Sequence, residues 1–213
     1  QRPDYTRTIT NASFGYFWKT SDHFKHFFNP FDINSIHLYD TIPNFHSLIP
    51  HYLKSSYDDF LITAINYSLV FNNQRINKSQ DFSFFTITLE SAGAGVGAYN
   101  SMKAAQKTDE YYKLFNVRYA QYFKTDIDYR FYHFFSSKNN LATRVFLGIG
   151  LPYGNSNELP FVKQFFCGGA NSIRAWSVRS LGPGTYFDSA STYQFQSADL
   201  KLESNLEYRF DIF

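Results

Sequence analysis

The sequence predicts an all-β protein, a fragment of an antiparallel transmembrane β-barrel with about six long strands. Aromatic residues make up 21% of the chain, chiefly 25 Phe and 17 Tyr, and these types favour the half-buried surface of a strand. Apolar and polar residues alternate with a period of two over segments longer than the roughly five or six residues of an average strand. The connections alternate between short and long, as periplasmic turns and extracellular loops do in outer-membrane barrels.

Three strands are predicted in the first half of the chain, over residues 5–19, 58–73 and 81–91. Their apolar faces carry Phe14, Tyr16 and Trp18; Leu61, Ile65, Tyr67, Leu69 and Phe71; and Phe85, Ile87 and Leu89. In the first segment the opposite face carries Arg7, Asn11 and Ser13, while Ile9 and Phe17 break the pattern. A membrane-crossing strand needs about 9–11 residues, and all three segments reach that length.

Three more strands are predicted over residues 117–135, 141–151 and 198–213. Their apolar faces carry Val117, Tyr119, Phe123, Ile127, Tyr129, Phe131 and Phe135; Leu141, Val145, Leu147, Ile149 and Leu151; and Ala198, Leu200, Leu202, Leu206, Tyr208, Phe210 and Ile212. The opposite face of residues 117–135 is charged, with Arg118, Lys124, Asp126, Asp128 and Arg130. We expect these five side chains to face the barrel lumen as a ladder of charges, while Tyr119, Phe123, Ile127 and Tyr129 face lipid.

The connections predict the direction of each strand. The short polar connections are residues 74–80 and 136–140, and the long ones are residues 20–57, 92–116 and 152–197. Because periplasmic turns are short, residues 5–19, 81–91 and 141–151 should run outward, with both chain ends on the periplasmic side. Six strands are too few for a barrel, since small barrels use about eight. We therefore expect residues 1–213 to be one partial barrel domain that lacks the remaining strands.

Several other classes of protein are disfavoured. The net charge of +2 is too small to predict nucleic-acid binding, and the mean hydropathy of −0.36 argues against helical membrane spans. Cys167 is the only cysteine, so no disulfide framework is possible within the chain. The glycine-rich residues 93–98 lack the βαβ context of a dinucleotide site and are expected to form a flexible loop. We find no nucleophile with a base at a recognisable spacing, and we expect no enzymatic activity, cofactor or metal.

The most distinctive segment lies in the last long connection. Gly168-Gly169 precede Ile173-Arg174-Ala175-Trp176, and Gly182-Pro183-Gly184 follow. Glycine permits tight reversals and close backbone approach, and the planar guanidinium of arginine suits a fixed partner. We expect Arg174 to be placed against a carboxylate, whereas Arg179, nearer the second group of glycines, is expected to be solvated.

The pattern Gly168-Gly169 followed by Ile173-Arg174-Ala175-Trp176 resembles the loop-six signature of the BamA/TamA superfamily of outer-membrane assembly factors, the bacterial surface antigen family. The wider sequence looks closest to TamA-like proteins of Bacteroidetes, through residues 151–156, 179–184 and 202–210. Ala175 departs from the glycine that the broader family has at this position. The resemblance implies a sixteen-stranded barrel preceded by periplasmic POTRA domains. We expect this chain to correspond to roughly strands seven to twelve, without the POTRA domains and the remaining strands.

The resemblance also implies a function without chemistry, the insertion or assembly of proteins in the outer membrane of a Gram-negative bacterium. Implied partners are outer-membrane lipids, unfolded outer-membrane client proteins and possible periplasmic or lipoprotein subunits, but no nucleic acid. In the family the loop-six arginine enters the lumen and pairs with acidic residues on later strands, which would lie beyond Phe213. Two alternatives remain, a pore for protein secretion and, less favoured, an ordinary porin.

Overall fold

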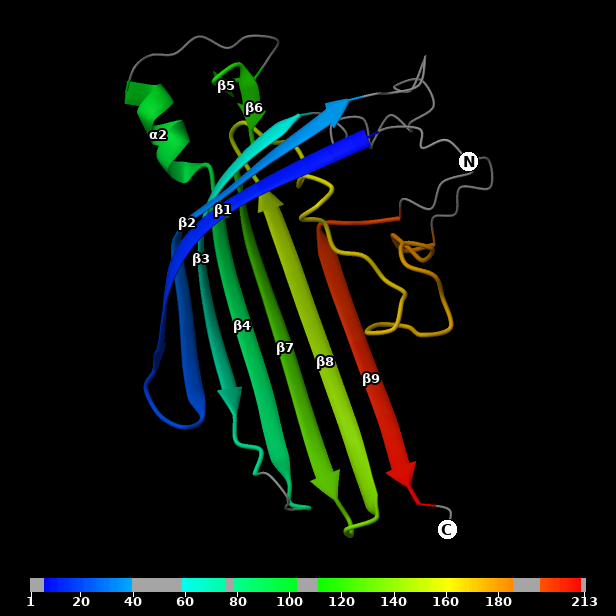
Figure 1. Cartoon of the computed structure of the whole chain (residues 1–213). Helices are drawn as coiled ribbons and strands as arrows, with labels where there is room; N and C mark the ends of the chain where they lie inside the picture. The colour runs from blue at the N-terminus through cyan, green and yellow to red at the C-terminus, as the bar shows by residue number, and fades with distance from the viewer. Residues whose placement is uncertain (1–5, 40–58, 76–78, 103–110, 186–195, 212–213) are drawn as a thin grey trace.

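The computed structural model describes residues 6–39, 59–75, 79–102, 111–185 and 196–211. Its main feature is a curved antiparallel sheet of seven long strands that are paired in chain order (Figure 1). The strands are β1 (Thr6–Lys19), β2 (Phe24–Tyr39), β3 (Phe60–Asn72), β4 (Phe82–Ala92), β7 (Tyr122–Phe134), β8 (Asn139–Pro152) and β9 (Leu200–Phe210). β1 and β9 are the two edges, and no pairing between them occurs within the described residues.

The two ends of the sheet differ in their connections. Short turns join β1 to β2, β3 to β4 and β7 to β8 at one end, and the long connections lie at the other (Figure 1). Three small elements, α2 (Ala94–Met102), β5 (Lys113–Leu114) and β6 (Val117–Tyr119), stand at the long-loop end. Among the described residues, no helix combines the length and apolar character needed to cross a membrane.

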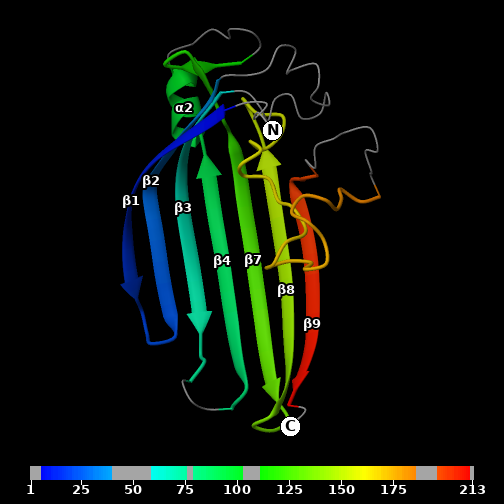
Figure 2. The ribbon, with the colours of Figure 1, turned by 45° about the vertical axis from the view of Figure 1, so that its right-hand side comes forward.

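The two faces of the sheet have opposite character. One face, the outer face, is apolar and exposed, with Leu202 and Leu206 of β9 at 73% and 70% exposure. The inner face carries Lys124, Asp126, Asp128 and Arg130, and most of their register partners on β4 and β8 are polar residues or glycines, the exceptions being Phe84 and Phe146. Figure 2 shows the curvature of the strands between these faces. The long alternating strands, of 11–16 residues, form part of the wall of a transmembrane β-barrel.

Aromatic and aliphatic side chains of the β8–β9 connection pack onto the inner face. Gly148 and Gly150 of β8 make room for them, because a Cβ atom there would lie 2.5 Å from Phe165 and Leu159, respectively. Leu159 is fully buried and joins a cluster from β2, β3, β4 and β7 that includes Ile62. The core of the described chain therefore lies inside the curve of the sheet, near the long-loop end.

Polar residues form a cap above this core. The Gln121 side chain donates from Nε2 to the carbonyl of Gly93 (3.3 Å) and accepts the backbone N–H of Asn155 (2.8 Å). The backbone N–H of Gln121 donates to the hydroxyl of Ser156 (2.9 Å), and Asn155 Nδ2 donates to the carbonyl of Tyr119 (2.8 Å). The cap thus ties the connections before β7 and after β8 to the end of β4.

The prediction of a long outer loop at residues 20–57 is wrong, because this region contains β2. The described sheet therefore has seven long strands where six were expected. Pro30 and a register shift between Asn29 and Asp32 interrupt the alternation of β2, and proline is tolerated in strands at such bulges. Gly15 of β1 accommodates the bulge, because a Cβ atom there would lie 1.8 Å from Oδ1 of Asn29. Residues 40–58 of the predicted loop lie outside the described residues.

The extra strand reverses the predicted direction of residues 5–19. β1 starts at the long-loop end and reaches a short turn at residues 20–23, so Thr6 and Phe210 lie at opposite ends of the sheet (Figure 1). With the β1–β2 turn at residues 20–23 as a short connection, the predicted alternation of short and long connections is confirmed. The predicted faces of β1 are confirmed, since Phe14, Tyr16 and Trp18 share the outer face.

The prediction of one strand over residues 117–135 is also wrong. Residues 120–121 separate β6 from β7, and β6 pairs in parallel with β3. Arg118 is consequently buried in the cap, where it donates to the carbonyl of Asn155 (3.2 Å) and does not extend the charge ladder. Tyr119 is fully buried and does not face lipid. The prediction of a flexible loop at residues 93–98 is wrong for most of this segment, because residues 94–102 form the helix α2. Only Gly93, with a φ of 69°, has the turn conformation that was expected.

Adjacent positions of β9 test the assignment of the two faces. In a Cys167→Ser background, we expect Asn205→Cys in liposomes to react with an aqueous maleimide, because Asn205 lines an inner-face cavity. Leu206→Cys should resist modification, because its side chain is on the exposed outer face, where we expect lipid to cover it. Mass spectrometry of the labelled protein measures both rates, and equal rates would contradict the assignment.

Asp81 fastens the short-turn end of β4 to β7 and provides a pH test. The N–H of Phe134 donates to Oδ1 (2.8 Å) and His133 Nδ1 lies 2.6 Å from Oδ2, so both hold the pKa of Asp81 below its ordinary value. This stabilisation is present above the ordinary pKa and is lost as the pH falls through the lowered one. In an NMR titration of the Asp81 carboxyl, His133→Gln should raise the titration midpoint of Asp81. The midpoint should stay below the ordinary pKa of an aspartate, because the hydrogen bond from the N–H of Phe134 remains. An unchanged midpoint would count against the pair.

Candidate functional site

The motif segment folds into a compact hairpin-like loop at residues 167–179. Gly168 and Gly169 both have a φ of 91°, and a Cβ atom at Gly168 would lie 2.1 Å from the carbonyl oxygen of Ser177. The N–H of Gly169 donates to the carbonyl of Trp176 (2.8 Å), and that of Arg179 donates to the carbonyl of Cys167 (3.0 Å). The glycine pair is therefore required by conformation and by space, and it leaves residues 170–175 at the tip.

The tip of this loop is bound to the inner face of β8 and β9. Arg144 of β8 donates from Nη1 to the carbonyl of Asn171 (2.8 Å), and the Ser172 hydroxyl donates to Oε2 of Glu203 on β9. Arg174 donates from Nη2 to Oε1 of Glu207, also on β9 (3.2 Å). Three residues of the tip, of which Arg174 belongs to the motif, thus contact the strands on either side of the last long connection.

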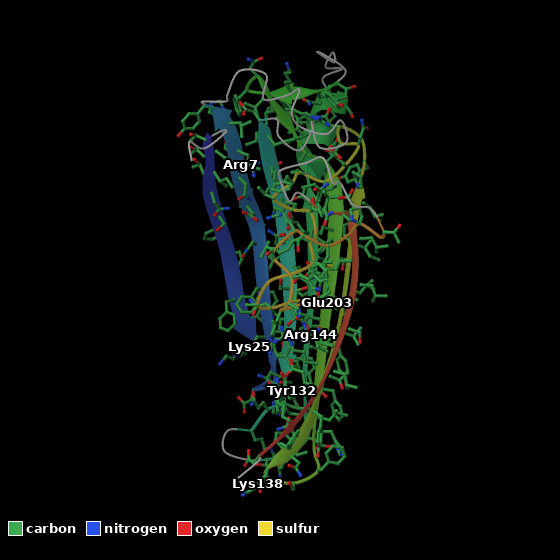
Figure 3. All side chains as sticks on the ribbon, turned by 90° about the vertical axis from the view of Figure 1, so that its right-hand side faces the viewer. Arg7, Lys25, Tyr132, Lys138, Arg144 and Glu203 are labelled. Carbon is green, nitrogen blue, oxygen red and sulfur yellow. The ribbon has the colours of Figure 1, made fainter. Side chains whose placement is uncertain are left out.

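Glu203 is the centre of this contact. Its side chain is only 4% exposed, and Lys201 Nζ lies 2.9 Å from Oε2 while Arg144 Nη1 lies 3.3 Å from Oε1. Figure 3 shows Arg144 and Glu203 near one another on the strands that the loop crosses. Arg144 also reaches Asp128 of β7 (3.0 Å), so the network links three strands to the loop. A buried carboxylate with these donors avoids the cost of an unpaired buried charge.

Arg174 contributes less to docking than its place in the motif suggests. The side chain is 72% exposed, and exposed ion pairs contribute about 0–1 kcal/mol. Hydrogen bonds to charged groups in protected positions contribute about 1.5–3 kcal/mol, so Ser172 and Asn171 provide the stronger attachment. The acidic partner of Arg174 within the described chain is Glu207, which Arg209 also holds (2.7 Å). The side chains of Ile173, Ala175 and Trp176 are exposed.

Arg179 is not solvated, contrary to the expectation from its position beside the glycines. Its guanidinium lies over the rings of Phe161 (4.3 Å) and Phe166 (4.4 Å), and its carbonyl accepts the N–H of Gln196 (3.3 Å). The residue has a φ of 60°, so its backbone makes a turn that glycine usually provides. Arg179 therefore joins the base of the loop to the returning chain.

The base of the loop covers the upper part of the charge ladder. Lys124 Nζ lies 4.3 Å from the centre of the Phe165 ring, and Lys163 Nζ lies 2.7 Å from Oε1 of Glu90. The Tyr122 hydroxyl also donates to Glu90, a buried carboxylate on β4. Lys124, Asp126, Asp128 and Arg130 share one face. Phe165 covers Lys124, and Asp128 is connected to the loop tip through Arg144.

Sequence reasoning missed four residues of the site, namely Arg144, Ser172, Glu203 and Glu207. The three strand residues lie on the polar inner face of β8 and β9. Gly148 and Gly150, on the same face of β8 as Arg144, were the signal in the sequence that another segment approaches this face. The arrangement provides reversible ion pairs and hydrogen bonds. The described residues contain no group of three or more His, Cys, Asp or Glu side chains that could hold a metal ion.

Gly168→Ala tests the conformation of the loop. Alanine at a positive φ costs about 1–3 kcal/mol, and its Cβ atom would meet the Ser177 carbonyl. We expect limited proteolysis to cleave residues 167–179 faster in this variant. Gly95→Ala is the control, because Gly95 lies in α2 with open space around its Cβ position, and it should leave the cleavage pattern unchanged. Equal resistance of Gly168→Ala and the unmodified protein would contradict this account.

The comparisons with known proteins agree with this geometry. No curated protein matches the chain significantly. The family model of the Omp85 superfamily domain matches residues 2–213, which is almost the whole chain. Omp85 proteins are non-enzymatic outer-membrane factors that act on client proteins, in membrane insertion or in secretion. The chain belongs to the Omp85 superfamily.

Proposed function

We propose that this protein is an outer-membrane insertion factor that assembles client β-barrels without enzymatic chemistry. The observation that carries the proposal is the loop at residues 167–179, whose tip is attached to the inner face of β8 and β9 through Asn171, Ser172 and Arg174. A loop held inside the curve of the sheet fills space that a steadily open pore would leave free. This supports an assembly role over that of an ordinary porin.

The physical mechanism would rest on strand edges and on the rigidity of the wall. An edge strand presents unpaired backbone N–H and C=O groups, which can template an incoming strand by β-augmentation. The network around Glu203 would hold β7, β8 and β9 together while another part of the barrel opens. Arg174 would brace the loop tip against Glu207 during this motion.

The proposed partners follow from the two faces and from the family. The exposed apolar residues of the outer face would contact outer-membrane lipids, and unfolded outer-membrane proteins would be the clients. Periplasmic or lipoprotein subunits would deliver these clients. The likeness of the motif to TamA-like proteins of Bacteroidetes supports a role in assembly, and secretion of a client through the lumen is the competing function.

Reconstitution separates these functions. The complete protein is placed in liposomes, and an unfolded outer-membrane protein is added from urea. An insertion factor should accelerate the appearance of the heat-modifiable, folded client in the bilayer. A secretion pore would instead deliver the client into the liposome lumen, where external protease cannot reach it. A porin would show steady conductance in planar bilayers and no effect on the client.

Variants of the loop tip test the bracing role. Arg174→Ala should slow client insertion, because it removes one of the two side-chain contacts between the tip and β9. Ser172→Ala should slow it further, because losing a bond to buried Glu203 costs about 1–3 kcal/mol. Arg75→Ala changes an exposed arginine near the β3–β4 turn and should be neutral. The rate of client folding, read from heat-modifiability on gels, measures all three, and unchanged insertion in Ser172→Ala would contradict the bracing role.

A further inference from the structure

A cavity lies directly below the loop tip on the inner face. It has a volume of about 490 Å³, and its walls come from β7, β8, β9 and the loop. Four arginines, one from each of these segments, line it: Arg130, Arg144, Arg209 and Arg174. A second cavity of about 370 Å³ continues toward the short-turn end and shares Arg130, Tyr132 and Arg209 with the first. The two form one groove along the inner face.

The ion-pair network around this groove has more positive than negative groups. Its cations are the four arginines and Lys201, and its anions are Asp128, Glu203 and Glu207. Five cations and three carboxylates leave a net charge of +2 within the network. The carboxylates are shared, so a further anion would not have to break every pair in order to bind.

The geometry leaves hydrogen-bond donors available on the arginines. Arg130 and Arg144 both approach the same oxygen of Asp128, at 2.7 and 3.0 Å. A guanidinium has five N–H donors, yet Arg174 makes a single hydrogen bond within the described residues, to Glu207. Arg209 lies over the ring of Tyr132 (5.8 Å), and that ring stacks on Phe82 (4.3 Å between centroids), which fixes the floor of the groove.

We propose that this groove is a binding site for an oxyanion, a carboxylate or a phosphate group, held by Arg130, Arg174 and Arg209. Planar guanidinium groups bind both anions through paired charge-assisted hydrogen bonds. A bound oxyanion would compete with Glu207 for Arg174 and would therefore loosen the loop tip from β9. The site lies in the wall itself and does not depend on whether the protein inserts or secretes its clients.

Calorimetry of the complete protein in detergent micelles tests the site, with inorganic pyrophosphate and tetraglutamate as separate probes. We expect at least one probe to bind, with an affinity that falls as sodium chloride is raised. Arg209→Gln and Arg130→Gln should each weaken binding about tenfold, since each removes a charge-assisted contact. Arg75→Gln, which changes an exposed arginine outside the groove, should bind as the unmodified protein does.

The outcomes are distinct. Binding of pyrophosphate alone assigns the site to phosphate groups, binding of tetraglutamate alone assigns it to carboxylates, and binding of both assigns it to oxyanions in general. Failure of both probes to bind the unmodified protein overturns the proposal, as does an equal loss in Arg75→Gln. Heat-modifiability of each variant verifies that its barrel is folded. If a glutamine variant does not fold, Arg209→Lys replaces it in the test. Lysine keeps the charge but not the planar guanidinium, so this variant should bind with intermediate affinity.

Discussion

The carboxylate of Glu203 is the point on which the lower half of the inner face depends. It is almost fully buried, and a charge in that position is stable only while its donors stay in place. Those donors come from β8, from β9 itself and from the loop, and Arg144 extends the connection to Asp128 on β7. The position of the loop and the spacing of three strands are therefore coupled through one side chain. A change in any of them would leave a buried charge with fewer partners.

Much of the sheet could be predicted because alternation reports directly on which side of a strand a residue lies. The outer faces of β1, β7 and β9 and the inner position of Lys124 to Arg130 followed from the sequence in this way. β2 could not be recognised, because Pro30 and the bulge beside it shift the alternation halfway along the strand. Missing one strand also reversed the direction assigned to β1, since each strand reverses the chain. The break at residues 120–121 was hidden because Val117 and Tyr119 continue the apolar pattern of β7, although they belong to the separate strand β6.

The candidate site was predicted unevenly, for a physical reason. Gly168 and Gly169 stood out because positive φ angles and close approach both favour glycine, and the structure uses both. The partners of the tip come from strands that lie 27 to 33 positions away in sequence, and no local pattern links Asn171 to Arg144 or Arg174 to Glu207. Arg179 was misjudged for the same reason, because the rings of Phe161 and Phe166 that hold its guanidinium are more than ten positions away in the sequence. Which residues of the loop and the strands meet depends on how the chain folds back onto the sheet, and this cannot be read from the pattern of one strand alone.

The cap at Gln121 and Asn155 has a consequence for the register of β7 and β8. Alternation excludes a slip by one residue, because that would turn every lipid-facing side chain inward, but a slip by two residues preserves both faces. Such a slip would move one strand along the other by about 7 Å. Gln121 would then lose both Asn155 and Ser156, which lie just beyond the far end of the β7–β8 hairpin. The cap thus selects one register of β7 and β8 from several that would all keep the apolar side chains on the lipid-facing side. The cap acts at the end of the hairpin opposite to the β7–β8 turn.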